Sequence, residues 1–267
     1  MSDTPHATFT SLHSGGRPLL LANAWDAGSA RLFQEAGAPA IATSSAAVAW
    51  SRGYPDGNAL PRSDLLDVVR NITRVCAVPL SVDVESGYSD DPREVAALVA
   101  DVVGAGAVGI NIEDGADTPT LLADKIAAIR DALGTTPLFI NARTDVVLAS
   151  IATGDAAVAM VIERQAMYAQ AGADGGFVPG LVSLDDASKI AQATPLALNV
   201  MARPGLPSRE DLHRVGVRRI SSGPWPYTCA LATGCDAVRA FLAGDTAPLY
   251  APRLDFDATN ALFRASK

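Results

Sequence analysis

The sequence predicts an α/β fold, a (β/α)₈ barrel (TIM barrel), and three observations lead to this prediction. The chain has 267 residues, and a barrel of this kind typically takes about 250. Short apolar runs alternate with longer segments of helical pattern, as in βα repeats. The apolar runs lack polar–apolar alternation, which is typical of strands buried on both faces in a parallel sheet. We see no linker, so residues 1–267 are expected to form one domain with a C-terminal helical extension.

The predicted strands are short and rich in small and β-branched residues, which suits a parallel sheet. Glycine followed by alanine or valine precedes several of them and indicates the turn from a helix into the next strand. In chain order the predicted strands are Leu19–Asn23, Ala40–Ser44, Leu80–Asp83, Val108–Ile112, Leu138–Asn141, Gly176–Val178, Leu196–Val200 and Arg219–Ser222.

The segments between the strands carry helix boundary signals. Asp91 followed by Pro92 is typical of a helix start, and Gly134 and Gly172 are typical of helix ends. The predicted helices are Ala27–Ala36, Arg62–Val75, Asp91–Gly104, Leu121–Leu133, Asp155–Ala171, Ser183–Ala193, Ser208–Val215 and Pro226–Ala243. The tail adds one shorter helical pattern, Asp257–Ala265.

The composition excludes several kinds of partner. A formal net charge of −8 argues against binding to nucleic acid or to an anionic membrane surface. No run of about 20 apolar residues could cross a membrane, and Met1–His13 lacks the apolar core of a signal peptide. The 3 cysteines show no metal-ligand spacing. We therefore expect a cytoplasmic protein with a small-molecule ligand.

Acidic residues gather where the predicted strands end, and that end of a barrel carries the active site. Asp83 and Glu85 are two residues apart, so on an extended segment they would point the same way. Glu113 ends the next strand. Three carboxylates at one barrel mouth would repel one another without a cation, and oxygen-only ligands suit Mg²⁺. As an alternative, Asp26, Asp114 and Asp145 could each serve as a helix N-cap.

Arg143 ends the fifth predicted strand and would face the same mouth. A guanidinium there could bind a substrate carboxylate through two parallel hydrogen bonds. The alternative is that Arg143 only balances the charge of Asp83, Glu85 or Asp145.

These segments together resemble the isocitrate lyase/phosphoenolpyruvate mutase superfamily over almost the whole chain. The resemblance is carried by Asn23–Ala30, Ser44–Ala49, Tyr54–Asp56, Ser81–Tyr88, Gly109–Asp114, Asn141–Asp145 and Gly172–Asp174. It implies a barrel whose eighth helix, here Pro226–Ala243, is exchanged between the subunits of a homodimer or homotetramer. It also implies chemistry through the enolate of a 2-oxo acid, stabilised by Mg²⁺ or by Mn²⁺ in its place.

The resemblance also implies roles for individual residues. Asp83 would touch the metal ion most directly, and Arg143 would bind the oxo-acid end of the substrate, so that Asp83, Arg143 and Glu113 form the catalytic set. The metal-binding residues would be Asp83, Asp56, Glu85 and Glu113, the last three through bound waters. The substrate-binding residues would be Trp25, Ser44, Ser45, Ala46, Arg143 and Asn199.

The chain departs from the superfamily pattern in one loop. Lyases of the superfamily carry a Lys-Lys/Arg-Cys-Gly-His loop after the glutamate of strand four, whereas Gly115–Leu122 contains no Cys, His or basic residue. The Lys and Asn that mutases and phosphonate hydrolases use there are also missing. Tyr88, Asp114 or a metal-bound water remain as alternative proton donors. Phe177 and Met201, near the ends of strands six and seven, are expected to be pocket wall or core.

We therefore expect a carbon–carbon lyase of this superfamily. It would act on a small 2-oxo or 2-hydroxy di- or tricarboxylic acid, in the manner of an isocitrate lyase or an oxaloacetate decarboxylase. Oxaloacetate or 2-oxoglutarate should at least bind. Two alternatives stay open: phosphonopyruvate hydrolase or mutase chemistry on a P–C bond, and a non-catalytic protein that binds a 2-oxo acid. The missing loop residues disfavour the first alternative and favour the second.

Overall fold

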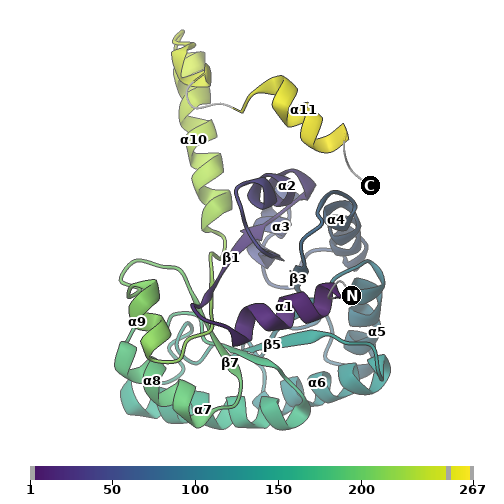
Figure 1. Cartoon of the computed structure of the whole chain (residues 1–267), viewed down its shortest axis with the longest axis vertical. Coiled ribbons are helices and arrows are strands. Elements are labelled where there is room, and N and C mark those ends of the chain that lie inside the picture. Colours follow the sequence, from purple (N-terminus) through teal and green to yellow (C-terminus); the bar gives the residue numbers. More distant parts are fainter. Residues whose placement is uncertain (1–3, 251–253, 265–267) are drawn as a thin grey trace.

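The computed structural model describes residues 4–250 and 254–264, and its centre is a closed barrel of parallel strands (Figure 1). Neighbouring strands pair in chain order, and the eighth closes onto the first. All the predicted strands are present, so the predicted fold class is confirmed. The strands are β1 Leu19–Ala24, β2 Ile41–Thr43, β3 Leu80–Asp83, β4 Gly109–Glu113, β5 Phe139–Arg143, β6 Gly175–Phe177, β7 Ala197–Met201 and β8 Arg219–Ser221.

The predicted helices are also present, and side chains at their first residues explain several boundaries. The hydroxyls of Thr118, Ser183 and Ser208 each accept a backbone hydrogen bond at a helix start. These helices are α2 Ala27–Glu35, α4 Arg62–Val75, α5 Pro92–Gly104, α6 Pro119–Leu133, α7 Gly154–Ala171, α8 Leu184–Ala193, α9 Arg209–Arg214 and α10 Trp225–Leu242. The tail pattern forms α11, Phe256–Arg264, and Ala265 lies outside the described residues.

A helix that the sequence analysis did not predict, α1 (Pro5–Ser14), covers the amino-terminal end of the barrel (Figure 1). Phe9 is fully buried and packs edge-on against Phe139 of β5, with ring centroids 5.4 Å apart. Its ring needs the glycine at position 109, where a Cβ would lie 2.9 Å from Phe9 Cε1. His13 stacks on the same Phe139 ring at 4.2 Å. Because α1 fills this end of the barrel, a ligand is expected to enter from the opposite end.

Between the Phe9 and Phe139 rings and the carboxyl ends of the strands, polar side chains fill the barrel interior. Arg219 of β8 is fully buried, and its Nη2 donates a hydrogen bond to Oδ1 of Asn111 on β4 at 3.1 Å. Asn141 of β5 donates to the same oxygen at 2.8 Å. Burial lowers the pKa of Arg219 to about 9, and the charge of Asp83 acts against that shift. These two hydrogen bonds fix the side chain of Asn111 inside the barrel, below the carboxyl ends of the strands.

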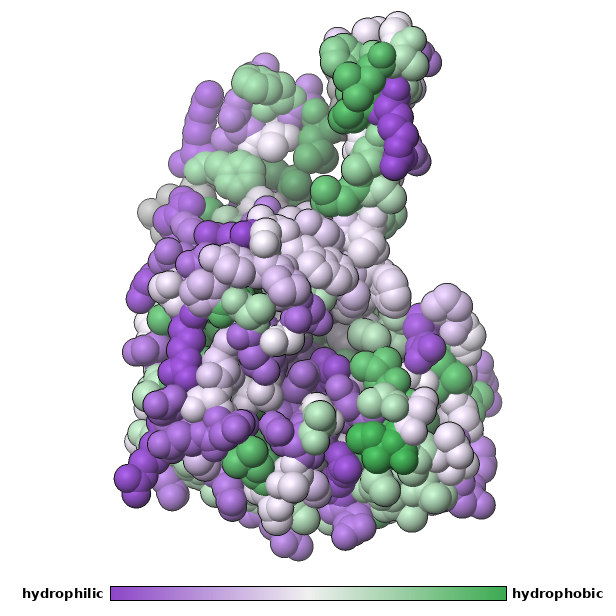
Figure 2. Space-filling model, turned by 180° about the vertical axis from the view of Figure 1, so that it is seen from behind, coloured by the Kyte–Doolittle hydropathy of each residue, from purple (hydrophilic) through white to green (hydrophobic). Residues whose placement is uncertain are grey.

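Helix α10 leaves the barrel and projects into solvent (Figure 1). None of its residues is buried, although Leu231, Val238 and Phe241 are apolar and exposed. Apolar surface accordingly gathers on the projecting part of the molecule (Figure 2). The expected exchange of this helix between subunits stays a prediction. No helix among residues 4–250 and 254–264 is long and apolar enough to span a bilayer.

Candidate active site

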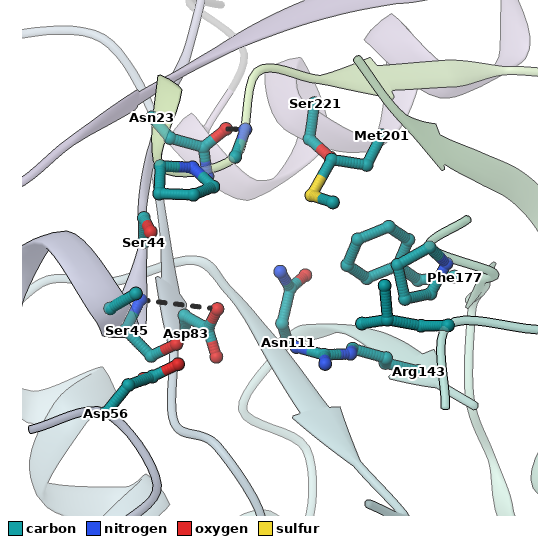
Figure 3. A pocket seen from close by; sticks show the side chains of 15 residues that line it. Asn23, Ser44, Ser45, Asp56, Asp83, Asn111, Arg143, Phe177, Met201 and Ser221 are labelled. Atoms are coloured by element: carbon teal, nitrogen blue, oxygen red, sulfur yellow. Dashed lines mark hydrogen bonds between the residues drawn. The ribbon is translucent and has the colours of Figure 1, made fainter. Parts of the chain in front are cut away.

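A small cavity of about 160 Å³ opens at the carboxyl ends of the strands (Figure 3). Its lining comes from nearly every strand and from the loops that follow them. The lining residues are Asn23, Ser44, Ser45, Ala46, Asp56, Asp83, Asn111, Arg143, Leu148, Phe177, Pro179, Met201, Ser221, Gly223 and Pro224. Of the predicted site residues, the structure therefore brings Asp56, Asp83, Arg143 and the Ser44–Ala46 segment together.

Asp83, the last residue of β3, supplies the most enclosed carboxylate of this cavity. Its Oδ1 accepts a hydrogen bond from the backbone N–H of Glu85 at 3.1 Å, and its Oδ2 lies 3.5 Å from the backbone nitrogen of Ser45. Burial raises the pKa of the Asp83 carboxyl, the charge of Arg143 lowers it, and the carboxylate of Asp56 raises it further. Asp56 faces Asp83 from the loop before α4 (Figure 3). Two acidic groups thus share one side of the cavity.

Arg143, the last residue of β5, is the only cation in the cavity lining. Its Nε and Nη2 donate to the two carboxylate oxygens of Asp145 at 2.7 and 2.8 Å. Its Nη1 lies 2.5 Å from Oε2 of Glu113. The ring of Phe177 lies under the guanidinium, 5.9 Å from its central carbon. Arg143 therefore does balance the charge of Asp145, as one of the alternatives stated. It also lines the cavity, so a ligand can still reach it.

Glu85 and Glu113 do not line the cavity. Glu85 adopts a left-handed backbone conformation with φ 51°, so the assumption that Asp83 and Glu85 lie on one extended segment is wrong. The Glu85 carboxylate instead accepts hydrogen bonds from the backbone of Asn58 and from the hydroxyl of Tyr88. Burial raises the pKa of Glu113 to about 8, which its ion pair with Arg143 opposes. Both glutamates are neighbours of Asp83; both carboxylate oxygens of Glu85 and one oxygen of Glu113 already have protein partners.

The contacts of these acidic residues show which of them could bind a metal ion. Within the described part of the chain, no three or more His, Cys, Asp or Glu side chains come together as a metal-binding group. Asp83, predicted to touch the ion directly, and Asp56 line the cavity, whereas the water-mediated roles predicted for Glu85 and Glu113 stay predictions. Asp83 and Asp56 nevertheless offer hard oxygen ligands on one side of the cavity. Because Mg²⁺ is usually bound through one or two carboxylates and keeps several waters, this pair fits it.

Trp25 and Asn199 lie outside the cavity lining, unlike the prediction for them. Trp25 packs edge-on against Tyr227 at the start of α10, with ring centroids 5.2 Å apart. Asn199 is fully buried beside Arg219 on the neighbouring strand, below the cavity. Asp26 is the N-cap of α2, so the capping alternative holds for this residue.

Comparison with known proteins decides the family. The family model for phosphoenolpyruvate phosphomutase matches residues 9–242. The chain belongs to the phosphoenolpyruvate mutase family. It is an enzyme of the isocitrate lyase/phosphoenolpyruvate mutase superfamily, as the sequence analysis predicted, and the relatives named below include a lyase.

Three of the relatives resemble the chain along most of its length. An uncharacterised protein of Mycobacterium tuberculosis is 36% identical, covering 94% of this chain and 95% of its own. An oxaloacetate decarboxylase of Pseudomonas entomophila is 30% identical, with 86% and 82% covered. A 2-methylisocitrate lyase of Escherichia coli is 32% identical, with 71% of each chain covered.

Two solved structures share the fold of the chain. A candidate phosphonomutase of Burkholderia cenocepacia has a TM-score of 0.84 and 41% identity, covering 89% of this chain and 100% of its own. A phosphonopyruvate hydrolase in complex with oxalate and Mg²⁺ has a TM-score of 0.85 at 21% identity, with 98% and 95% covered, which shows the same fold.

The connection between β4 and α6 is short. It spans only residues 114–118, because Thr118 already caps α6. Asp114 does not face the cavity: it is buried and accepts hydrogen bonds from Arg164 and from Tyr168, each at 2.7 Å. Tyr88 donates its hydroxyl to Glu85 at 2.9 Å and does not line the cavity either. Neither side chain is placed as a proton donor.

The sequence analysis missed Asn111 and assigned no role to Ser221, both of which line the cavity. Asn111 is a polar residue between two isoleucines of β4, and such a residue must point into the barrel, since the outer face of the strand packs on apolar helices. That pattern in Gly109–Glu113 was the available signal for Asn111. Phe177 and Met201, expected as wall or core, belong to the wall.

Proposed function

We propose that this enzyme is a Mg²⁺-dependent lyase that acts on a small 2-oxo or 2-hydroxy di- or tricarboxylic acid and breaks a carbon–carbon bond of it through an enolate intermediate. The observation that carries the proposal is the position of Asp83 opposite Arg143 across one small cavity at the barrel mouth (Figure 3). A pair of acidic groups for a hard cation and one guanidinium for a carboxylate are what such a substrate requires. Mn²⁺ could replace Mg²⁺.

The substrate carboxylate would bind at the start of α3, Ser45–Ser51, between these two groups. The first backbone N–H groups of a helix have no partner within the helix. That of Ser45 makes only a long contact of 3.5 Å with Asp83, so it remains free to donate to a ligand. Ser44 and Ala46 line the same cavity, and the Ser44 hydroxyl accepts a hydrogen bond from the backbone N–H of Ala47 at 3.4 Å.

Arg143 would orient the oxo-acid end of the substrate, because Asp145 holds its guanidinium in a fixed plane. Asp83 and Asp56 would bind the cation directly or through water. A bound Mg²⁺ would supply Lewis-acid stabilisation of the oxyanion as it develops. The cavity lining contains no Cys, His, Lys or Tyr. The proton that completes a lyase reaction would therefore come from water that enters past the short 114–118 connection.

The relatives support this reaction class. Proteins named oxaloacetate decarboxylase and 2-methylisocitrate lyase are 30% and 32% identical to the chain over the aligned residues, and a protein of the same fold was solved with oxalate and Mg²⁺. Small oxo acids such as oxaloacetate or 2-oxoglutarate are therefore the first ligands to test. The exposed free thiols of Cys229 and Cys235 support the expected cytoplasmic location, where thiols stay reduced.

The test is a comparison of wild type with Asp83→Ala. Calorimetry would measure binding of Mg²⁺ alone, and then of pyruvate and 2-oxoglutarate to the Mg²⁺-saturated protein. Turnover would be assayed with oxaloacetate, isocitrate and 2-methylisocitrate. Asp83→Ala should remove metal-dependent binding and turnover, whereas Asp236→Ala on the exposed surface of α10 should change neither. If no 2-oxo acid of three to five carbons binds the Mg²⁺-saturated wild type, the proposal is wrong.

The short 114–118 connection favours one competing function, a protein that binds a 2-oxo acid without turning it over. In that case 2-oxo acids would bind and depend on Asp83, but no substrate would be consumed. Phosphonopyruvate belongs in the same assay, because release of phosphate would instead assign the P–C bond chemistry.

A further inference from the structure

The side chain of Asn111 on β4 has a free hydrogen-bond donor. Its Oδ1 already accepts two hydrogen bonds, from Nη2 of Arg219 at 3.1 Å and from Nδ2 of Asn141 at 2.8 Å. Its Nδ2 has no hydrogen-bond partner among residues 4–250 and 254–264. That nitrogen is not fully enclosed by protein either. The two N–H groups of this amide are therefore open to a ligand.

Arg219 determines which end of the Asn111 amide faces the barrel interior. A guanidinium carries only donors, so the atom that it contacts must be the amide oxygen. Turning the amide over would set Nδ2 against Nη2 of Arg219, two donors facing each other where Arg219 is fully buried. Within the described residues Arg219 makes no ion pair, and its Nε and Nη1 have no partner, so Asn111 is its one acceptor there. The orientation of the amide is thereby fixed.

The free donor belongs to the base of the cavity, next to the acidic residues. Asn111 is the register partner of Asp83 on the neighbouring strand, so the two side chains point to the same side of the sheet. Both line the cavity with Arg143 (Figure 3). A ligand that lies between Asp83 and Arg143 consequently passes over the Asn111 amide.

The hydrogen bond from Arg219 makes the Asn111 amide a stronger donor toward the cavity. Hydrogen bonds in a chain polarise one another, and here the first donor of the chain is a buried guanidinium. Part of the effect of this positive charge thus reaches the cavity through a neutral side chain. The carboxylate and the C2 oxygen of a 2-oxo acid are hydrogen-bond acceptors only, which is the chemistry that such a donor binds.

We propose that Nδ2 of Asn111 donates a hydrogen bond to the oxo-acid end of the substrate, and that Arg219 is the positioning residue that turns this donor toward the cavity. The inference rests on the proposed function, since it takes a 2-oxo acid as the ligand. Asn111 is a substrate-binding residue in this arrangement. Arg219 acts through Asn111 and does not line the cavity.

Two substitutions of Asn111 test the donor, with calorimetry of pyruvate binding to the Mg²⁺-saturated protein. Asn111→Ala removes the donor without adding charge and should weaken pyruvate binding by about 10-fold or more. Asn111→Asp keeps an oxygen for Arg219 but replaces Nδ2 with a second oxygen, and it should weaken binding further. Affinity for Mg²⁺ alone should not fall in either variant. Asn71→Asp on the exposed surface of α4 is the matched control and should change neither affinity.

The outcomes separate this inference from the proposed function. If the wild type does not bind pyruvate, the proposed function fails and the inference fails with it. If the wild type binds pyruvate and Asn111→Ala binds it equally well, only the inference is wrong. Weaker binding by Asn111→Asp alone would also overturn the inference, because the added charge and not the lost donor would be the cause.

NMR of the wild type tests the same contact without relying on Asn111→Ala to fold. The side-chain ¹⁵N amide resonance of Asn111, assigned by its absence from Asn111→Asp, should shift when pyruvate binds. The Asn71 amide should not shift, and an Asn111 amide that stays unmoved at saturation would contradict the proposal.

Arg219 is tested by the same two measurements. Arg219→Met should weaken pyruvate binding and abolish the ligand-induced shift of the Asn111 amide, because nothing then prevents the amide from turning over. Arg219→Lys still presents only donors to Asn111 and should retain both the binding and the shift. A shift that persists in Arg219→Met, or equal pyruvate binding by the two variants, would show that Arg219 does not position the amide.

Discussion

Asp145 accepts two parallel hydrogen bonds from Arg143, at 2.7 Å from Nε and at 2.8 Å from Nη2. This geometry fixes the plane of the guanidinium and leaves Nη1 directed at Glu113. The backbone N–H of Asp145 in turn donates to buried Asp114 at 3.0 Å. The one cation of the cavity is thus oriented by a residue that does not itself line the cavity.

The first prediction concerns that orientation. Asp145→Asn should lower kcat/KM for the natural substrate by about 10- to 100-fold, since hydrogen bonds to charged groups contribute about 1.5–3 kcal/mol. Affinity for Mg²⁺ alone should change little, because Asp145 is not among the cavity residues. Steady-state kinetics and metal calorimetry would measure both, with Asp155→Asn on the exposed surface as the matched control. Unchanged kinetics in Asp145→Asn would show that Arg143 keeps its orientation without this partner.

The second prediction concerns Asp114, which the sequence left open as a proton donor. Its carboxylate is buried and bound by Arg164 and Tyr168, so Asp114→Asn should lower the free energy of unfolding by about 3–5 kcal/mol. Asp236→Asn breaks an exposed ion pair with Arg239 and should cost about 1 kcal/mol or less. Urea unfolding would compare the two. A variant that stays stable but loses turnover would restore Asp114 as a proton donor.

The strands and helices of the barrel could be predicted because each depends on a local pattern. Apolar runs mark the strands, and capping residues such as Ser183 and Ser208 mark the helix starts. Asp83 and Arg143 could be predicted for the same reason, since each is the last residue of a strand and strand ends meet at one face of the barrel.

The remaining parts of the site depend on contacts that are distant in sequence. Glu85 turns away from Asp83 because the backbone of Asn58 and the hydroxyl of Tyr88 bind its carboxylate, and nothing in the Asp-Val-Glu segment indicates those partners. The family resemblance implied that Asn199 lines the cavity, but Asn199 lies lower on β7, beside Arg219 of β8. Helix α1 was missed because only Phe9 and His13 are buried on it, too few to give a helical apolar pattern.

The third prediction concerns His13 and acid stability. Burial, together with the charge of Arg219, lowers the pKa of His13 to about 3, whereas in the unfolded chain it should be near its usual 6.5. The unfolded chain therefore binds one more proton between these two values, and the free energy of unfolding falls as the pH drops below 6.5. The slope attributable to His13 approaches about 1.4 kcal/mol per pH unit.

His13→Phe isolates this effect, because a phenyl ring can keep the stacking on Phe139 and cannot take up a proton. Between pH 6.5 and pH 5 the variant should lose about 2 kcal/mol less stability than wild type, as measured by urea unfolding at both pH values. The raised pKa values of Asp83, Glu85 and Glu113 act in the opposite direction and are present in both proteins, so they cancel in the comparison. Parallel loss of stability in the two proteins would show that His13 is not held neutral.

The last prediction concerns α10 and the expected exchange of this helix between subunits. No residue of α10 is buried, yet Leu231, Val238 and Phe241 expose apolar side chains on it. Exposed apolar surface of this kind is typical of a protein–protein interface. Light scattering should therefore give a mass of at least twice the 27.5 kDa of one chain. The double variant Val238→Glu, Phe241→Glu should shift the protein toward the monomer, since an apolar interface cannot pair the added charges. Asp236→Ala on the same helix is the matched control and should keep the wild-type mass, while a wild type that runs as a monomer would argue against the exchange.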